Sequence, residues 1–163
     1  MTDEEFCSLY EAHARRLWGF VVRITDDAAV AEEIVQESFM RVFTARRLDS
    51  ATPEHRRRYL YTVATNLIRR SRRAEASEPL TESMTATEHA PMEDGVDVQN
   101  ALSALSHTER ATLWLAHVEG WSHREIARAL GYRESSLRQV AVRAKRRFIE
   151  ALGVGRREER GDS

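Results

Sequence analysis

The sequence contains little of the residue types that mark secreted, membrane or β-rich proteins. Cys7 is its single cysteine, so no disulfide can form within the chain. No apolar run approaches the roughly 18 residues of a membrane span, and none resembles the apolar segment of a signal peptide. With only 3 prolines and 7 glycines, the chain has too few turn residues for a β-barrel. We therefore expect an all-α, cytoplasmic protein without a membrane segment.

The sequence also lacks the usual signatures of catalysis and of metal binding. It has neither Walker glycines nor a recognisable catalytic serine, and its six histidines are scattered along the chain. His13 lies on an apolar helical stripe, where a core position is expected, and its spacing from Cys7 fits no metal site. We expect no catalytic residue, no metal and no cofactor, and hence a protein that acts by binding.

The net charge of -1 conceals a strong division of charge along the chain. Residues 53–74 hold seven arginines and one glutamate, and residues 122–152 hold eight basic and three acidic side chains. Between them, residues 75–100 carry seven acidic side chains and no lysine or arginine. Basic blocks of this size attract polyanions, although two solvated helix faces would have the same composition. Nucleic acid is therefore the first partner to test.

Apolar residues at three- and four-residue spacing predict helices throughout the chain. Three of these are expected at about residues 6–24, 28–42 and 53–73, the last opened by Thr52 and Pro53. We predict two small helical domains, joined by an acidic flexible linker. The boundaries are residues 1–74, 75–97 for the linker, 98–152 for the second domain and 153–163 for a short tail.

The second predicted helix has a polar ridge opposite its apolar face. Glu33, Gln36, Glu37 and Met40 follow helical spacing, and Arg41 stands one turn beyond Glu37. Such a ridge is usually only solvated, so the pattern alone leaves its role open.

The third predicted helix combines arginines with an aromatic residue and an amide on its outer side. This composition suits single-stranded or melted nucleic acid, because guanidinium groups hold phosphates while rings and amides engage exposed bases. The residues concerned are Arg56, Arg57, Arg58 and Tyr59 at the start of the helix, and Thr62, Asn66, Arg69, Arg70 and Arg73 further along.

The second domain shows the pattern of a helix-turn-helix. Two S-x-x-E capping boxes begin at Ser106 and Ser122, and Gly120 and Gly131 follow the helices that these boxes open. A helical hairpin with a solvated basic face is the alternative. In a helix-turn-helix, the start of the second helix enters the major groove and later residues contact phosphates. The corresponding residues are Arg133, Glu134, Ser135, Ser136, Arg138 and Gln139 at the start, then Arg143, Lys145, Arg146 and Arg147.

Four segments together resemble an extracytoplasmic-function (ECF) sigma factor of bacterial RNA polymerase, within the sigma-70 superfamily. They are "VAEEIVQESFMRVF", "RRYLYTVATNLIRRSRR", "ALSALSHTERATLWLAHVEGWSHREIARALGY" and "SSLRQVAVRAKRRF". Their order is that of the family's second and fourth regions, and the resemblance covers about residues 6–152. It implies a non-enzymatic factor that directs promoter-specific transcription initiation.

The resemblance implies a role for the ridge of the second helix and for the third helix. Glu33, Gln36, Glu37 and Phe39 match the family motif that docks on the β′ clamp helices of core polymerase, with Met40 and Arg41 beside it. Asn66 matches the asparagine that contacts an extruded base of the minus-ten element. The loop at residues 48–52, with Ser50, lies where the family captures a base. The remaining minus-ten candidates are Arg56, Arg57, Tyr59, Arg69, Arg70 and Arg73.

The resemblance also assigns the minus-thirty-five element to the last helix. Ser136, Leu137, Arg138 and Arg143 match the T-V-K and R of the family's recognition helix, and Arg133, Ser135, Gln139 and Lys145 accompany them. The β flap of polymerase is a further implied partner, and the family permits an anti-sigma factor.

Some residues depart from the family pattern. Tyr59 replaces a tryptophan, Glu33 replaces an aspartate and Val140 occupies a position that is often basic. Arg133 stands where a serine-type cap commonly begins the recognition helix, so the base-contacting set could shift by one residue. Two alternatives stay open: a helix-turn-helix regulator independent of polymerase, and a sigma-fold interaction protein that does not initiate transcription.

Overall fold

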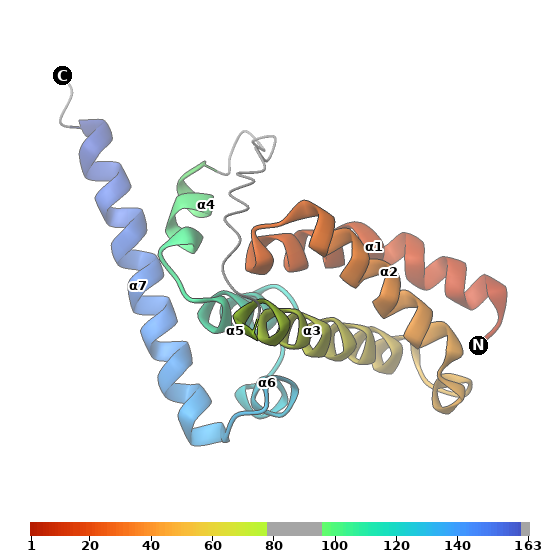
Figure 1. Ribbon diagram of the computed structural model, residues 1–163. Coiled ribbons are helices and arrows are strands. Elements are labelled where there is room, and N and C mark those ends of the chain that lie inside the picture. The colour runs from red at the N-terminus through yellow and green to blue at the C-terminus, as the bar shows by residue number, and fades with distance from the viewer. Residues whose placement is uncertain (78–95, 161–163) are drawn as a thin grey trace. The chain divides into compact units, whose positions relative to one another are not determined.

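The protein is built from helices that form two compact units. The computed structural model describes residues 1–77 and 96–160, and neither range contains a strand (Figure 1). The chain divides into Met1–Thr87 and Glu88–Ser163. The predicted all-α fold is thus confirmed, whereas most of the predicted linker lies outside the described residues. No described helix has the length and apolar character needed to cross a membrane.

The described residues of the first unit form three helices that all pack against one another. They are α1 (Asp3–Thr25), α2 (Ala28–Thr44) and α3 (Pro53–Ser77), with a short 3-10 turn, η1 (Arg46–Leu48), between the last two (Figure 1). The α3 helix continues beyond the predicted end at residue 73.

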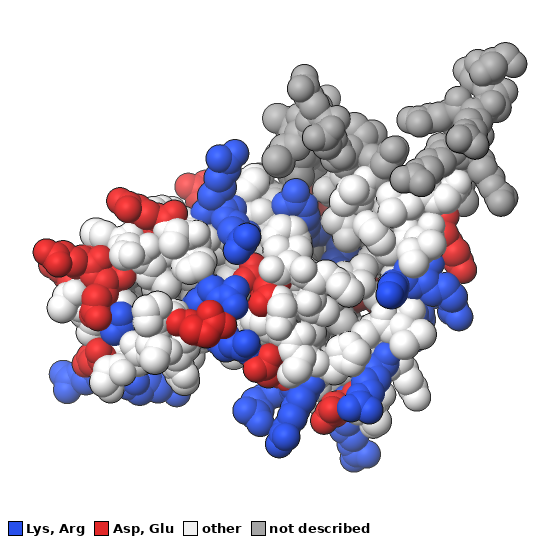
Figure 2. Space-filling model, turned by 180° about the vertical axis from the view of Figure 1, so that it is seen from behind, with Lys and Arg blue, Asp and Glu red and all other residues white. Residues whose placement is uncertain are grey.

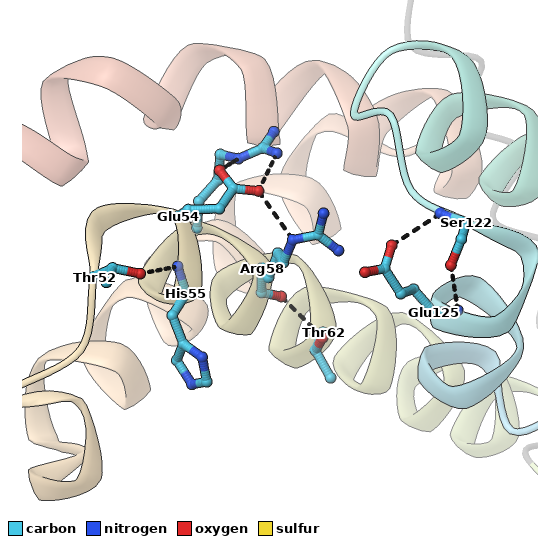
Figure 3. Close-up of polar contacts among 8 residues, drawn as sticks. Thr52, Glu54, His55, Arg58, Thr62, Ser122 and Glu125 are labelled. Atoms are coloured by element: carbon cyan, nitrogen blue, oxygen red, sulfur yellow. Dashed lines mark hydrogen bonds and ion pairs between the residues drawn. The ribbon is translucent and has the colours of Figure 1, made fainter.

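Side-chain caps set the helix boundaries in the first unit. Thr2 and Glu5 form a capping box at the start of α1, and the Asp27 carboxylate accepts the amides of Ala29 and Val30 at the start of α2. Thr52 Oγ1 accepts the His55 amide at 3.2 Å, which caps α3 (Figure 3). Such caps satisfy amide groups that the helix leaves unpaired.

The core of the first unit combines the apolar stripes of its three helices. The rings of Phe20 and Tyr61 lie 5.3 Å apart inside it. On α3, Leu60, Val63, Ala64 and Ile68 are buried, whereas Leu67 is half-buried. Fully buried apolar side chains are those of Leu17, Phe20, Val21, Ala31, Val42, Leu48, Leu60, Tyr61 and Ala64.

The second unit is organised around one long helix. It contains α4 (Val96–Ser103), α5 (His107–His117), α6 (His123–Leu130) and α7 (Glu134–Arg160). The α7 helix packs on each of the other three, and α5 also packs on α6 (Figure 1). It extends to Arg160, through residues that the sequence assigned to a tail, because no proline interrupts this stretch.

The α6 and α7 helices form the predicted helix-turn-helix. Both predicted capping boxes are present, and that of Ser122 and Glu125 is drawn in Figure 3. Gly131 closes α6 in the left-handed region at φ 74°, a conformation that costs glycine no steric strain. The side chains packed around this turn are buried, namely those of Ile126, Ala127, Leu130, Leu137 and Val140.

Candidate functional site

The α2 helix exposes the polar ridge that the sequence singled out. Ala31, Ile34 and Val35 are buried on its opposite side, which turns the ridge outward. The Arg41 guanidinium donates to the Glu37 carboxylate at 2.7 Å, and both side chains are about half exposed. Such an exposed pair adds little stability, so these groups can exchange partners at low cost. The exposed members of the ridge are Glu33, Gln36, Glu37, Met40 and Arg41.

Phe39 differs from the other candidates on α2, because it lies in the interior. Only 2% of its surface is exposed, and its ring packs 4.9 Å from Tyr10 and 6.1 Å from Phe6. From this position it supports the ridge from beneath. Tyr10 and Phe43 are also partly exposed, and neither was predicted as a binding residue from the sequence. The position of Phe43 three residues after Met40 was the available signal.

The outer face of α3 presents an amide and arginines along one line. Asn66, Arg70 and Arg73 are exposed at i, i+4 and i+7, whereas Arg69 is half-buried beside them. The structure therefore brings four of the predicted minus-ten candidates to one helical face. Guanidinium groups spaced along a helix face can track a phosphate backbone.

The basic cluster at the start of α3 is partly neutralised within the protein. Glu54 accepts from Arg57 at 3.0 and 2.8 Å and from Arg58 at 2.9 Å (Figure 3). The hydrogen bond from Arg57 is the largest cause that lowers the pKa of Glu54 to about 2, and Arg58 adds to it. These two arginines thus contribute less free charge than their number suggests.

Tyr59 is covered by an arginine from the preceding turn. The Arg47 guanidinium lies 4.4 Å from the centre of the Tyr59 ring and donates to its hydroxyl. This cation–π contact joins η1 to α3. Sequence reasoning missed Arg47, and the only signal was an arginine pair preceding the loop. Ser50, in the same loop, is exposed.

Arg56 is the candidate whose placement differs most from expectation. Its side chain is 6% exposed. It donates to the backbone carbonyls of Leu48 and Asp49 and pairs with Glu5 of α1. The guanidinium is therefore directed into the protein, behind the loop, and its position does not support the predicted contact with DNA.

The start of α7 presents the predicted groove-facing residues. The helix begins at Glu134, and the carbonyl of Arg133 accepts the Leu137 amide at 3.0 Å. Arg138 pairs with Glu134 at 2.9 Å. Basic side chains gather where α6 meets α7 (Figure 2). The exposed candidates are Arg133, Ser135, Ser136, Arg138, Gln139, Arg143 and Lys145.

A buried carboxylate holds two arginines of α7. Glu109 of α5 is 1% exposed and accepts from Arg143 at 2.9 Å and from Arg147 at 3.1 Å. It also accepts the Ser106 amide at 3.2 Å as part of its capping box. Both guanidinium groups remain about half exposed. The sequence revealed Glu109 only as a cap, because its partners lie more than 30 residues further along the chain.

Both units match regions of one protein family. Residues 9–78 match Sigma-70 region 2, and residues 96–148 match Sigma-70 region 4. The chain is 34% identical over 161 residues to the ECF RNA polymerase sigma factor SigL of Mycobacterium tuberculosis, covering 91% of each chain. It is 29% identical over 163 residues to the RNA polymerase sigma factor CarQ of Myxococcus xanthus, covering 93% of this chain and 91% of CarQ.

The fold is also similar to that of a solved protein. The sigma factor RpoE of Bartonella quintana, crystallised in complex with the anti-sigma factor NepR, superposes with a TM-score of 0.68 at 21% identity. The match covers 93% of this chain and 98% of that one. At this level of identity the likeness shows the fold alone.

Proposed function

The chain belongs to the ECF group of the sigma-70 family and is an RNA polymerase sigma factor. From this we propose which of its surfaces bind core polymerase and which bind promoter DNA. The ridge of α2 docks on the β′ clamp helices of core polymerase. The outer face of α3 and the loop at residues 48–52 engage the melted minus-ten element, and the start of α7 enters the major groove of the minus-thirty-five element. The family is one of non-enzymatic initiation factors, so this chain contributes binding and positioning.

One observation carries the proposal. Each matched region folds as a unit of its own, and each unit turns a different kind of surface outward. In the first unit, the exposed line Asn66, Arg70 and Arg73 combines an amide with guanidinium groups, as recognition of unpaired bases requires. In the second unit, exposed Ser136, Arg138 and Gln139 lie at the start of a helix-turn-helix recognition helix, where base edges of duplex DNA are contacted.

The proposed partners follow from these surfaces. Core polymerase binds α2 by its clamp helices and the second unit by the β flap. Both it and promoter DNA are cytoplasmic, which is where we place the protein. An anti-sigma factor is a further proposed partner, by analogy with the Bartonella quintana complex. We expect such a partner to compete with core polymerase for the α2 ridge, and competition that Glu37→Arg leaves unaltered would contradict this.

The experiment that tests the proposal is transcription in vitro with purified core polymerase, full-length protein and genomic DNA fragments. We expect a discrete transcript. Glu37→Arg reverses a charge on the exposed ridge and should abolish both core binding and the transcript. Asn66→Ala should leave core binding intact and weaken the transcript or alter the choice of promoter.

The matched control is Glu32→Arg, which makes the same charge change at an exposed position next to the ridge. It should support transcription near the wild-type level. Core binding without a transcript from any promoter would instead favour a protein that sequesters polymerase. Equal loss in Glu32→Arg and Glu37→Arg would show that general acidity of α2, and not the ridge, carries the interaction.

A further inference from the structure

The loop between α2 and α3, taken here as residues 46–51, contains one short element, η1. Its backbone makes only short-range turns: the amides of Leu48, Asp49 and Ala51 donate to the carbonyls of residues three positions earlier. These bonds join residues that are close in the chain, so they do not connect the loop to the rest of the first unit. Its orientation must therefore come from other parts of the first unit.

Arg56 supplies that connection from the first turn of α3. Its Nε donates to the Leu48 carbonyl at 3.2 Å, and its Nη2 donates to the Asp49 carbonyl at 3.1 Å. Its Nη1 lies 3.1 Å from Glu5 Oε1 on α1. The planar guanidinium presents these donors at fixed angles, so one side chain joins the loop, α1 and α3.

Other contacts also hold the loop against the first unit. The Leu48 side chain is fully buried, and Arg47 covers the Tyr59 ring. Asp49 and Ser50, between these anchors and α3, are exposed. The N-terminal ammonium of Met1 donates to the Asp49 carboxylate at 2.5 Å, and the Asp49 side chain remains 59% exposed. The loop is thus held from the inside while its tip stays accessible.

We propose that Arg56 is a positioning residue, which with Glu5 holds the 46–51 loop so that its exposed tip at Asp49 and Ser50 selects an unpaired base of the minus-ten element. This inference rests on the proposed function, in which the first unit binds melted promoter DNA. It replaces the expectation that Arg56 is itself a DNA contact.

A direct phosphate contact is the competing role. To reach DNA, the guanidinium would have to leave two backbone carbonyls and the Glu5 carboxylate, all of which would lose a charge-assisted partner. The two roles differ in their salt dependence. A residue that neutralises one phosphate changes the slope of log K against log salt by about 0.7 for single-stranded DNA, whereas a positioning residue leaves this slope unchanged.

The test uses holoenzyme assembled from core polymerase and the full-length protein. Binding is measured at several salt concentrations to promoter fragments that carry an unpaired minus-ten segment, with each of the four bases placed in turn at every position. The variants are Arg56→Gln and Glu5→Gln. Glutamine at position 5 can still accept the Thr2 amide in the capping box of α1, so this change removes mainly the charge that faces Arg56. Glu4→Gln, on the adjacent exposed position, is the control.

We expect Arg56→Gln to reduce the preference for the best base at one minus-ten position by about tenfold, the size of a typical single-base effect, with an unchanged salt slope. Glu5→Gln should reduce the preference at the same position by a smaller factor, and Glu4→Gln should match wild type. Arg70→Gln, on the exposed face of α3, should show the reverse: a slope lower by about 0.7 and a retained preference.

Two results would overturn the inference. One is a lower salt slope with full base preference in Arg56→Gln, which would indicate a phosphate contact. The other is wild-type base preference in Glu5→Gln. This result is decisive even if Arg56→Gln fails to fold, because the Glu5 side chain is 43% exposed and its replacement by glutamine keeps the capping box. Failure of the proposed function is distinguishable from both, since wild-type holoenzyme would then show no preference among these fragments.

Discussion

Individual charged side chains in this protein have roles that their chemistry alone does not reveal. Arginines serve as exposed candidates for DNA contact at Arg70 and Arg73, as a ring cover at Arg47 and as an internal brace at Arg56. The long, flexible stem of arginine allows its head group to reach either solvent or the interior. The acceptors within reach decide between these outcomes.

Replacement of the buried Glu109 carboxylate should lower the free energy of unfolding of the second unit. In Glu109→Gln, the pairs with Arg143 and Arg147 are lost, and a buried amide takes the place of a carboxylate with several donors. We expect the second unit to lose about 1–3 kcal/mol, because hydrogen bonds to charged groups are strong and buried groups are costly to leave unsatisfied. Urea denaturation followed by tryptophan fluorescence would measure this change.

Glu125→Gln is the matched control for Glu109→Gln. It alters the same position in the capping box of α6, where Glu125 accepts the Ser122 amide at 2.9 Å. Glutamine at this position can also form the capping box. Its effect should be well below that of Glu109→Gln. Equal destabilisation by the two variants would attribute the cost to the capping boxes and not to the arginine pairs.

Glu54 should contribute stability that depends on pH. Because its folded-state pKa is lowered from 4.5 to about 2, the contribution is complete above pH 4.5 and is lost as the pH falls towards 2. Its exposure limits the effect at neutral pH to about 0.2–1 kcal/mol. Thermal unfolding of wild type and Glu54→Gln should therefore differ at pH 7 and converge between pH 4.5 and 2. A constant difference over this range would contradict the assignment.

The helix ends show how short motifs determine where each helix starts and stops. Each of the capping boxes at Thr2, Ser106 and Ser122 contains both of its hydrogen bonds. A left-handed residue follows several helices, at Asp26, Gly120 and Gly131. These conformations are local and can be predicted from a few neighbouring residues.

Two glycines should respond oppositely to alanine. Gly120 has φ +71° and nothing within 4 Å of an added Cβ, so Gly120→Ala introduces backbone strain without a clash. We expect a loss of about 1 kcal/mol. Gly153 also has open space around it but lies within α7, so Gly153→Ala should add about 0.5–1 kcal/mol through helix propensity.

Chemical denaturation of the full chain would measure both glycine variants. The midpoint of the second unit should fall for Gly120→Ala and rise for Gly153→Ala, with similar slopes. A fall for Gly153→Ala would mean that the end of α7 is not helical in solution, contrary to the structure.

The molecule as a whole joins two units of different surface character in one chain. The basic residues concentrate in residues 53–74 and 122–152, whereas the net charge is only -1. Each unit has its own core, so a surface change in one should not alter the stability of the other. Surface changes in the two units should therefore combine only in their effect on promoter binding by the holoenzyme.

This separation predicts additive effects on promoter affinity. Arg70→Gln in the first unit and Arg146→Gln in the second each remove one exposed guanidinium. We expect the salt slope of holoenzyme binding to fall by about 0.7 for the first variant, on single-stranded DNA, and by about 0.9 for the second, on duplex DNA. The double variant should show the sum. A double variant no weaker than either single one would show that only one unit is engaged.

The amino-acid sequence by itself determined the class of fold, most helix boundaries and the family. Each of these depends on residues close together in the chain: apolar spacing, caps, turn glycines and contiguous motifs. The exposed faces of α2, α3 and α7 also followed from helical periodicity, because burial of one side leaves the other outside.

Only the tertiary structure decided which members of those motifs face inward. Phe39 belongs to a family motif but packs against Phe6 and Tyr10 of α1. Arg56 reaches Glu5, and Glu109 reaches Arg143, across large separations in sequence. Such contacts depend on how whole helices pack, and no local pattern encodes that arrangement. For the same reason, the contacts by which Arg56 holds the 46–51 loop could be identified only from the packing of α1, the loop and α3.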